Sequence, residues 1–126
     1  MSKPLRAVIV SHAEMGEALL HAAKAIVGQV DGVIAISNDG CGTEALGERI
    51  LAAVDGAPTV VFVDLPGGSC FQAAARQMHD KENVAVVAGV NLAMLLDFLY
   101  HRDVSPAEAA ARAVDAGSRA IRQLPR

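Results

Sequence analysis

The chain has 126 residues, of which 52% are hydrophobic and only 3% are aromatic. This length suits a single domain over residues 1–126, built around an aliphatic core. Eleven Lys and Arg against 14 Asp and Glu give a net charge of −3, and without a basic stripe or an aromatic platform we expect no nucleic-acid partner.

The predicted elements alternate between strand and helix. Leu5–Ser11 is an apolar, β-branched run that predicts a strand, and Glu14–Val27 places apolar residues at helical spacing before Gly28. The further elements expected in chain order are a strand at Gly32–Ser37, a helix with Leu46, Ile50 and Val54 on one face, a strand at Thr59–Asp64, a helix from Ser69 to about Asp80, a strand at Asn83–Ala88 and a helix from Asn91 to about His101.

The last predicted helix has a clear start and an ambiguous end. Ser105-Pro-Ala-Glu108 is a capping box with proline at the first helical position. Gly117 is a candidate end for this helix, and Ser118–Leu124 is then left without an assigned element.

Strands that alternate with helices and are apolar along almost their whole length are typical of a parallel sheet covered on both faces. Right-handed crossovers restrict the topology to a few doubly wound orders. We therefore expect an α/β fold, with a doubly wound, mostly parallel four-stranded sheet in the order 2-1-3-4 and helices on both faces.

The compartment is indicated by three features of the sequence. Its apolar runs are too short to span a bilayer, and no signal-peptide pattern precedes the strand-like run at Leu5. Cys41 and Cys70 follow no metal or redox spacing, so both are expected to be free thiols. We expect a cytoplasmic protein with no metal and no cofactor.

The predicted topology also places a site. In a doubly wound sheet, ligands bind beyond the carboxyl ends of the strands, between neighbouring strands whose crossovers run in opposite directions. In the order 2-1-3-4 that point lies between the first and third strands. His12 follows the first strand, and Asp64 with its glycine-rich turn follows the third. We expect the two side chains to meet there.

Their chemistry is complementary. A carboxylate on one imidazole nitrogen fixes the tautomer and leaves the lone pair of the other nitrogen free to attack. Gly67 and Gly68 let backbone amides approach closely, and Ser69, with Gln72 three residues on, is expected to be the N-cap of the next helix. Because helix N-termini bind phosphate, the pattern indicates a nucleophilic histidine that faces an anion cradle.

Purely structural interpretations stand beside this one. A loop histidine is more often ordinary than catalytic, an aspartate after a strand commonly caps a turn, and Ser11-His-Ala-Glu14 also fits a capping box. His21, His79 and His101 are expected on the surface. Cys70 lies near the site, so a reactive thiol is possible. A thiol enzyme is disfavoured, because the sequence offers no obvious histidine as a partner for this cysteine. The coincidence of His12 and Asp64 at the switch point strengthens the functional interpretation until it stands level with the structural ones.

Three segments carry a resemblance to a known family. They are Val8-Ile-Val-Ser-His12, Val63-Asp-Leu-Pro-Gly-Gly-Ser69 and Ala88-Gly-Val-Asn-Leu-Ala-Met-Leu-Leu96. In this order and spacing they resemble the enzyme IIA domain of the mannose family of the bacterial sugar phosphotransferase system, over nearly the whole chain. Three motifs together are far more specific than any one of them.

The resemblance implies a division of labour. His12 would accept a phosphoryl group from the phosphocarrier HPr and pass it to a histidine on a IIB partner, and Asp64 would orient and support it. The residues implied to surround the phosphate are Ala13, Gly67, Gly68 and Ser69. The family also implies a homodimer, often with a C-terminal strand exchanged between subunits, that meets the membrane permease only through IIB.

Four positions depart from the family pattern. Ala13 stands where the family usually has glycine, Cys70 and Ala93 where it has proline, and Gln72 where it has asparagine. None of these changes removes a chemical group that phosphoryl transfer needs. They leave the sugar and the choice of partner open.

Other functions stay open at this point. One is a regulatory phosphocarrier of an incomplete phosphotransferase system that transports no sugar. Another is the phosphoryl donor of dihydroxyacetone kinase, which Gly42-Thr-Glu-Ala45 faintly resembles but the Gly89-Val-Asn-Leu92 segment opposes. A third, of a different class, is a non-catalytic dimeric anion-binding protein.

Overall fold

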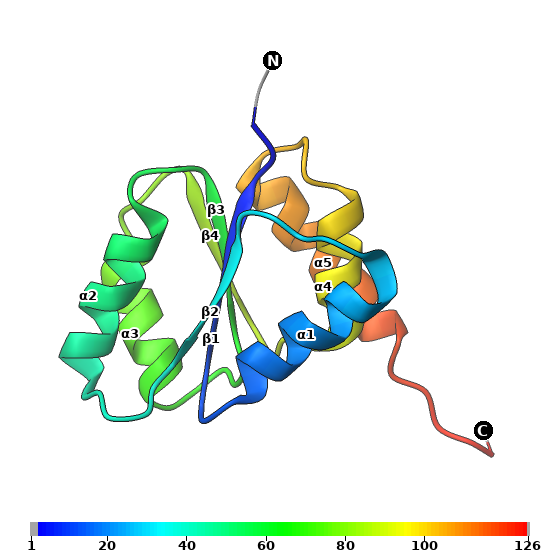
Figure 1. Cartoon of the computed structure of the whole chain (residues 1–126), viewed down its shortest axis with the longest axis horizontal. Helices are drawn as coiled ribbons and strands as arrows, with labels where there is room; N and C mark the ends of the chain where they lie inside the picture. Colours follow the sequence, from blue (N-terminus) through cyan, green and yellow to red (C-terminus); the bar gives the residue numbers. More distant parts are fainter. Residues whose placement is uncertain (1–2, 126) are drawn as a thin grey trace.

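The computed structural model describes residues 3–125, which alternate between strands and helices as the sequence predicts (Figure 1). In chain order the elements are β1 (Arg6–Ser11), α1 (Met15–Val27), β2 (Val33–Ser37), α2 (Thr43–Val54), β3 (Thr59–Val63), α3 (Ser69–Met78), β4 (Val84–Ala88), α4 (Leu92–Tyr100) and α5 (Pro106–Arg119). Most predicted boundaries differ from these by a residue or two.

The four strands form one parallel sheet in the order β2-β1-β3-β4, which confirms the expected topology. In the register of the sheet, Val10 of β1 lies beside Ile36 of β2 on one side and Val63 of β3 on the other. The residues that leave β1 and β3 therefore start from adjacent positions at the carboxyl edge of the sheet.

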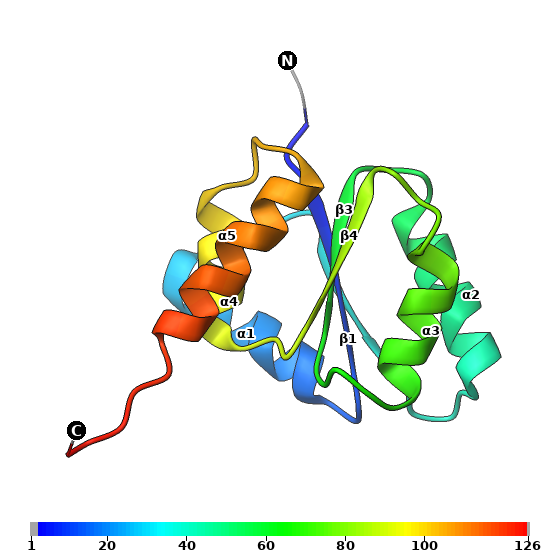
Figure 2. The same ribbon diagram turned by 180° about the vertical axis from the view of Figure 1, so that it is seen from behind.

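Helices cover both faces of the sheet: α2 and α3 lie on one side, and α1, α4 and α5 on the other (Figures 1 and 2). Residues of β3 alternate between the two layers, since Val61 and Val63 pack with α2 and α3 while Phe62 packs with α4. Phe62 meets Phe98 edge to face, with ring centroids 5.5 Å apart. Strands buried on both faces explain their nearly continuous apolar sequence.

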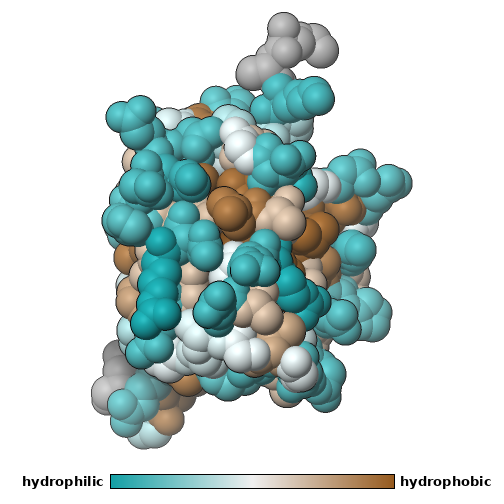
Figure 3. All heavy atoms as spheres, turned by 90° about the vertical axis from the view of Figure 1, so that its left-hand side faces the viewer, coloured by the Kyte–Doolittle hydropathy of each residue, from teal (hydrophilic) through white to brown (hydrophobic). Residues whose placement is uncertain are grey.

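The outer surface of the α2 and α3 layer is mostly hydrophilic, with smaller hydrophobic areas between the polar side chains (Figure 3). Among the residues that the structure describes, no helix is long and apolar enough to cross a membrane.

Side chains cap two of the helices. Ser105 accepts a hydrogen bond from the backbone N–H of Glu108 at 3.1 Å, as the capping motif predicts, and Asn91 caps α4 in the same way. The alternative capping box at the start of α1 is not formed. Helix α1 begins at Met15, and the Ser11 hydroxyl instead accepts from the N–H of Gly16 at 2.8 Å.

Helix α5 continues through Gly117 to Arg119, so Gly117 does not end it. Its role is close packing: a Cβ added at Gly117 would lie 2.2 Å from Cγ of Met94 in α4. Ser118 therefore lies in the helix rather than in the unassigned segment. Beyond the helix, the apolar side chains of Ile121 and Leu124 are 78% and 87% exposed.

Candidate functional site

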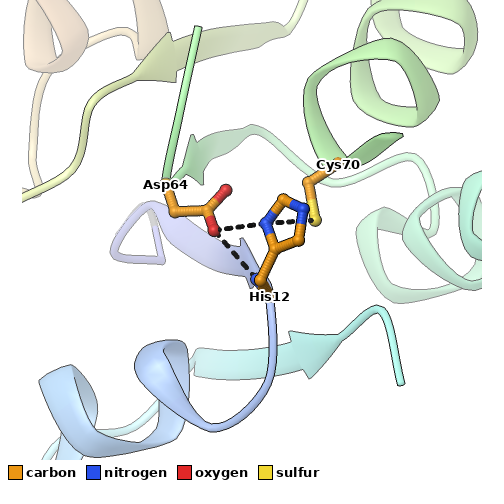
Figure 4. A group of neighbouring side chains, drawn as sticks. All are labelled: His12, Asp64 and Cys70. Carbon is orange, nitrogen blue, oxygen red and sulfur yellow. Dashed lines mark hydrogen bonds and ion pairs between the residues drawn. The ribbon is translucent and has the colours of Figure 1, made fainter. Parts of the chain in front are cut away.

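The central pair of the site is His12 and Asp64. Each follows directly on a strand, β1 or β3, and the parallel register brings them together. Nδ1 of His12 lies 2.7 Å from Oδ2 of Asp64, and the backbone N–H of His12 donates to the same oxygen at 2.8 Å (Figure 4). The structure thus places both side chains at the switch point between these strands.

Asp64 is buried and held as a carboxylate. Its residue is 8% exposed, and its other oxygen, Oδ1, accepts from the N–H of Leu65 at 2.9 Å. Burial alone would raise the pKa of Asp64, but hydrogen bonds from His12 and Leu65, together with attraction to the His12 ring, lower it below its usual value. The carboxyl group therefore stays ionised at neutral pH.

The ionised carboxylate sets the tautomer of His12. Because Asp64 can only accept, Nδ1 carries the proton, and the lone pair lies on Nε2. The His12 side chain is 46% exposed, and Nε2 makes no hydrogen bond within residues 3–125. The arrangement presents an accessible nitrogen nucleophile backed by a negative charge.

The turn after Asp64 forms an uncapped helix N-terminus. Gly68, not Ser69, is the N-cap of α3, and no side chain caps the helix, so the expected Ser69 cap is wrong. The first helical hydrogen bond runs from the N–H of Gln72 to the carbonyl of Gly68, which leaves the amides of Ser69, Cys70 and Phe71 without helical partners. Free amides and the helix dipole attract anions here.

The conformation of Gly68 explains why Ser69 is displaced from the cap. Gly68 has φ +89° and ψ −174°, a region that essentially only glycine adopts. A Cβ added at Gly68 would lie 3.9 Å from Cε1 of His12, so the imidazole lies beside the N-terminus of α3. The glycine-rich turn brings backbone, rather than side chains, up to the ring.

Ala13 turns the chain from His12 into α1 and adopts φ +48°, in the left-handed region. Its backbone N–H donates to Oδ1 of Asn38, in the loop after β2, at 3.3 Å. Glycine reaches this conformation without the steric cost that a Cβ adds. Glycine would therefore adopt the conformation of this position more easily than the alanine that stands there.

Cys70, which the sequence places near the site, contacts His12 directly, and sequence reasoning did not predict that contact. It is fully buried, and its Sγ lies 3.7 Å from Nδ1 of His12 (Figure 4). Burial and the charge of Asp64 raise the pKa of the Cys70 thiol, and a hydrogen bond with the Ser69 side chain opposes this only in part. A neutral thiol of this kind is a poor nucleophile, which argues against a thiol enzyme.

The remaining histidines lie away from this pair. His21 is exposed on α1, and His79 is exposed with its Nδ1 bound to the carbonyl of Arg76. His101 is partly buried rather than fully on the surface, with Nδ1 2.9 Å from the Asp97 carbonyl oxygen. Only His12 combines a carboxylate partner at the switch point with a neighbouring uncapped helix.

The fold and the pair together define an α/β protein with a carboxylate-backed histidine beside an anion-binding helix terminus, which is a site suited to the transfer of an anionic group. The family model described as "PTS system fructose IIA component" matches residues 6–115. The chain belongs to this family, the phosphotransferase-system IIA components of the mannose type.

Known relatives agree with this assignment. The "PTS system mannose-specific EIIAB component" of Escherichia coli K12 is 39% identical over 124 residues, which cover 93% of this chain and 38% of that protein. The chain therefore spans well under half the length of this relative.

Solved structures share the fold. The mannose/sorbose-specific IIA subunit of Enterococcus faecalis superposes with a TM-score of 0.85 at 25% identity, over 98% of this chain and 97% of that one. A phosphotransferase-system EIIA component of Streptococcus agalactiae gives a TM-score of 0.88 at 19% identity, over 94% and 96% of the two chains, which shows the fold alone.

Proposed function

We propose that this chain is a phosphoryl carrier of a bacterial sugar phosphotransferase system, which accepts phosphate from HPr on His12 and donates it to a IIB component. The observation that carries the proposal is the 2.7 Å contact between Nδ1 of His12 and buried Asp64, which leaves Nε2 free beside the uncapped N-terminus of α3. Family membership supports the same assignment.

The proposed step is an in-line displacement at phosphorus. The Nε2 lone pair of His12 forms the new N–P bond while the bond between phosphorus and its donor breaks, and the donor keeps that electron pair. The ring becomes cationic as Nε2 is substituted, and the carboxylate of Asp64 stabilises this charge through Nδ1–H. The reverse step, with a IIB side chain as the nucleophile, returns His12 to its starting state.

The proposed phosphate site consists of the turn before α3. The free amides of Ser69 and Cys70 and the dipole of α3 would stabilise the phosphoryl oxygens, while Gly67 and Gly68 leave room for them. Ala13, on the other side of His12, is the remaining residue that we place next to the phosphate.

The direct test is incubation with enzyme I, HPr and phosphoenolpyruvate, followed by intact-mass measurement. We expect one added phosphoryl group that is lost in acid and that is transferred when a IIB component is supplied. The name of the Escherichia coli relative makes a mannose-type IIB the first acceptor to try. A chain that gains no phosphoryl group would instead be a non-catalytic anion-binding protein.

We also propose where and how the chain works. It acts in the cytoplasm as a homodimer and meets a membrane permease only through IIB. The exposed apolar side chains of Ile121 and Leu124 beyond α5 support a role for this segment at the dimer interface.

Shortening the chain tests the dimer. Because α5 ends at Arg119, a chain that stops there keeps the helix intact and removes only the segment with Ile121 and Leu124. We expect light scattering to give the mass of a monomer for this variant and of a dimer for the parent. A control with Ile121→Ser and Leu124→Ser at full length should weaken the dimer as well. A shortened chain that remains a folded dimer would contradict the proposal.

Ser69→Ala tests the hydroxyl as a phosphate ligand. Because Gly68 occupies the N-cap, this change removes no cap, and we expect the melting temperature to stay close to that of the parent. Loss of a hydrogen bond to a charged group typically costs about 1.5–3 kcal/mol, so transfer or phosphohistidine lifetime should fall roughly 10- to 150-fold. If Ser69→Ala transfers phosphate at the parental rate and its phosphohistidine has the parental lifetime, the hydroxyl is not a ligand and backbone amides alone bind the phosphate.

A further inference from the structure

The side chains around His12 also form a set of metal ligands. One ligand atom from each of His12, Asp64 and Cys70 lies within 4.8 Å of the others. Figure 4 shows the imidazole between the carboxylate and the thiol, contributed by three separate segments of the chain. Metal sites are recognised in a sequence by short, regular spacings between the ligands. These three residues have no such spacing, which is why the sequence predicts no metal.

We infer that His12, Asp64 and Cys70 bind a zinc ion, and that the bound ion blocks phosphorylation of His12. Imidazole, carboxylate and thiolate are the ligands that zinc takes in proteins, and a thiolate favours zinc over magnesium or calcium. The binding itself is independent of the proposed function, whereas the block rests on it.

The distances suit such an ion after a small adjustment. With Zn–N of about 2.0–2.1 Å and Zn–S of about 2.3 Å, a tetrahedral site separates nitrogen from sulfur by about 3.6 Å. The separation of Nδ1 of His12 from Sγ of Cys70 is 3.7 Å. With Zn–O of about 2.1 Å the same geometry separates nitrogen from oxygen by about 3.4 Å, so the 2.7 Å contact between Nδ1 and Asp64 has to open by about 0.7 Å, which a turn of the half-exposed His12 ring provides.

The surroundings already orient the ligands. The two oxygens of Asp64 accept hydrogen bonds from the backbone amides of His12 and Leu65, and a carboxylate that binds a metal keeps such bonds. Asp64 and Cys70 are buried, while His12 is exposed and lies next to the thiol, so the ion can reach the site from the His12 side.

Binding moves two protons. The Cys70 thiol releases its proton to solvent as the Zn–S bond forms. The free energy of that bond offsets the cost of deprotonating a thiol whose pKa burial raises. The proton on Nδ1 of His12 also leaves, and the neutral ring carries its proton on Nε2 instead, because Nδ1 now donates its lone pair to zinc. Nε2 is the proposed phosphoryl acceptor, so a ring that binds zinc through Nδ1 has lost its nucleophile.

Metal titration tests the site without any phosphoryl transfer. We expect the reduced chain to bind Zn²⁺ in competition with a chromogenic chelator and to bind Co²⁺ with a near-ultraviolet thiolate charge-transfer band. Cys70→Ser should remove the band and weaken zinc binding about 100-fold, since even changes behind metal ligands cost about 10–100-fold. Cys41→Ser, the matched change at the other free cysteine, should leave both unchanged.

Phosphorylation by enzyme I, HPr and phosphoenolpyruvate tests the block. Zinc should reduce the labelling of the parent and of Cys41→Ser, a chelator should restore it, and the ratio of labelling with and without zinc should move toward one in Cys70→Ser. Phosphorylation of HPr itself is followed in the same zinc concentrations to exclude an effect upstream.

Equal zinc affinity of the parent and Cys70→Ser, or a charge-transfer band lost in Cys41→Ser instead, would overturn the site. Labelling that zinc does not change while the site is filled would overturn the block. Absence of any labelling without zinc would overturn the proposed function and leave the metal titration standing.

Discussion

His12→Gln is expected to lose phosphorylation completely. Glutamine keeps a polar side chain of similar size but has no nucleophilic nitrogen, and the other histidines lack a buried carboxylate partner at the switch point. The measurement is intact mass after incubation with enzyme I, HPr and phosphoenolpyruvate, and the parent should gain a single acid-labile group.

His79→Gln is the matched control for this change. His79 is exposed, and its Nδ1 contacts only the carbonyl of Arg76, so its removal should leave labelling at the parental level. A phosphoryl group that persists in His12→Gln would place the acceptor elsewhere and remove the basis of the proposed mechanism.

Asp64→Asn is expected to slow phosphoryl transfer roughly 10- to 10³-fold. The corresponding change in a catalytic triad costs about 10⁴-fold, but a phosphohistidine needs less proton handling. The amide of asparagine can donate a hydrogen bond to Nδ1, which stabilises the tautomer with the proton on Nε2. Asparagine also carries no negative charge to stabilise the positive charge that the ring gains on phosphorylation. Rapid-quench measurement of transfer from phosphorylated HPr gives the rate directly.

Two comparisons keep the Asp64 result interpretable. Asp39→Asn removes a carboxylate from the exposed loop after β2 and should transfer at the parental rate. A melting curve shows whether Asp64→Asn still folds, since the change also weakens the acceptor for the amides of His12 and Leu65. Parental kinetics in a folded Asp64→Asn would show that the carboxylate is only structural.

The arrangement of the sheet could be predicted because it depends on patterns that the sequence carries openly. Buried parallel strands are apolar almost throughout, as in Val60–Val63, and the handedness of the crossovers limits their order. The meeting of His12 and Asp64 follows from that order, because each residue comes directly after one of two neighbouring strands.

The details that could not be predicted depend on contacts between distant segments. Nothing in the local sequence shows that Cys70 contacts His12, because the direction of its side chain depends on how the first turn of α3 is oriented in the folded chain. Gly117 looked like a helix end because glycine is common there, yet Met94 on α4 determines its role. Gly68, not Ser69, is the N-cap of α3, because the helix begins after the unusual backbone conformation of this glycine.

The strand order also governs how the chain assembles. Every pairing in the sheet joins strands that have at least one helix between them in the sequence, so no two strands can form a local hairpin. The chain must therefore lose the conformational entropy of closing a long loop before two strands can form hydrogen bonds. Of the four strands, β1 is made before the others but lies inside the sheet, with β2 and β3 as neighbours. Its apolar residues therefore lack one of their two neighbouring strands in the nascent chain until β3 has been made. His12 and Asp64, which follow β1 and β3, come together in that same late event.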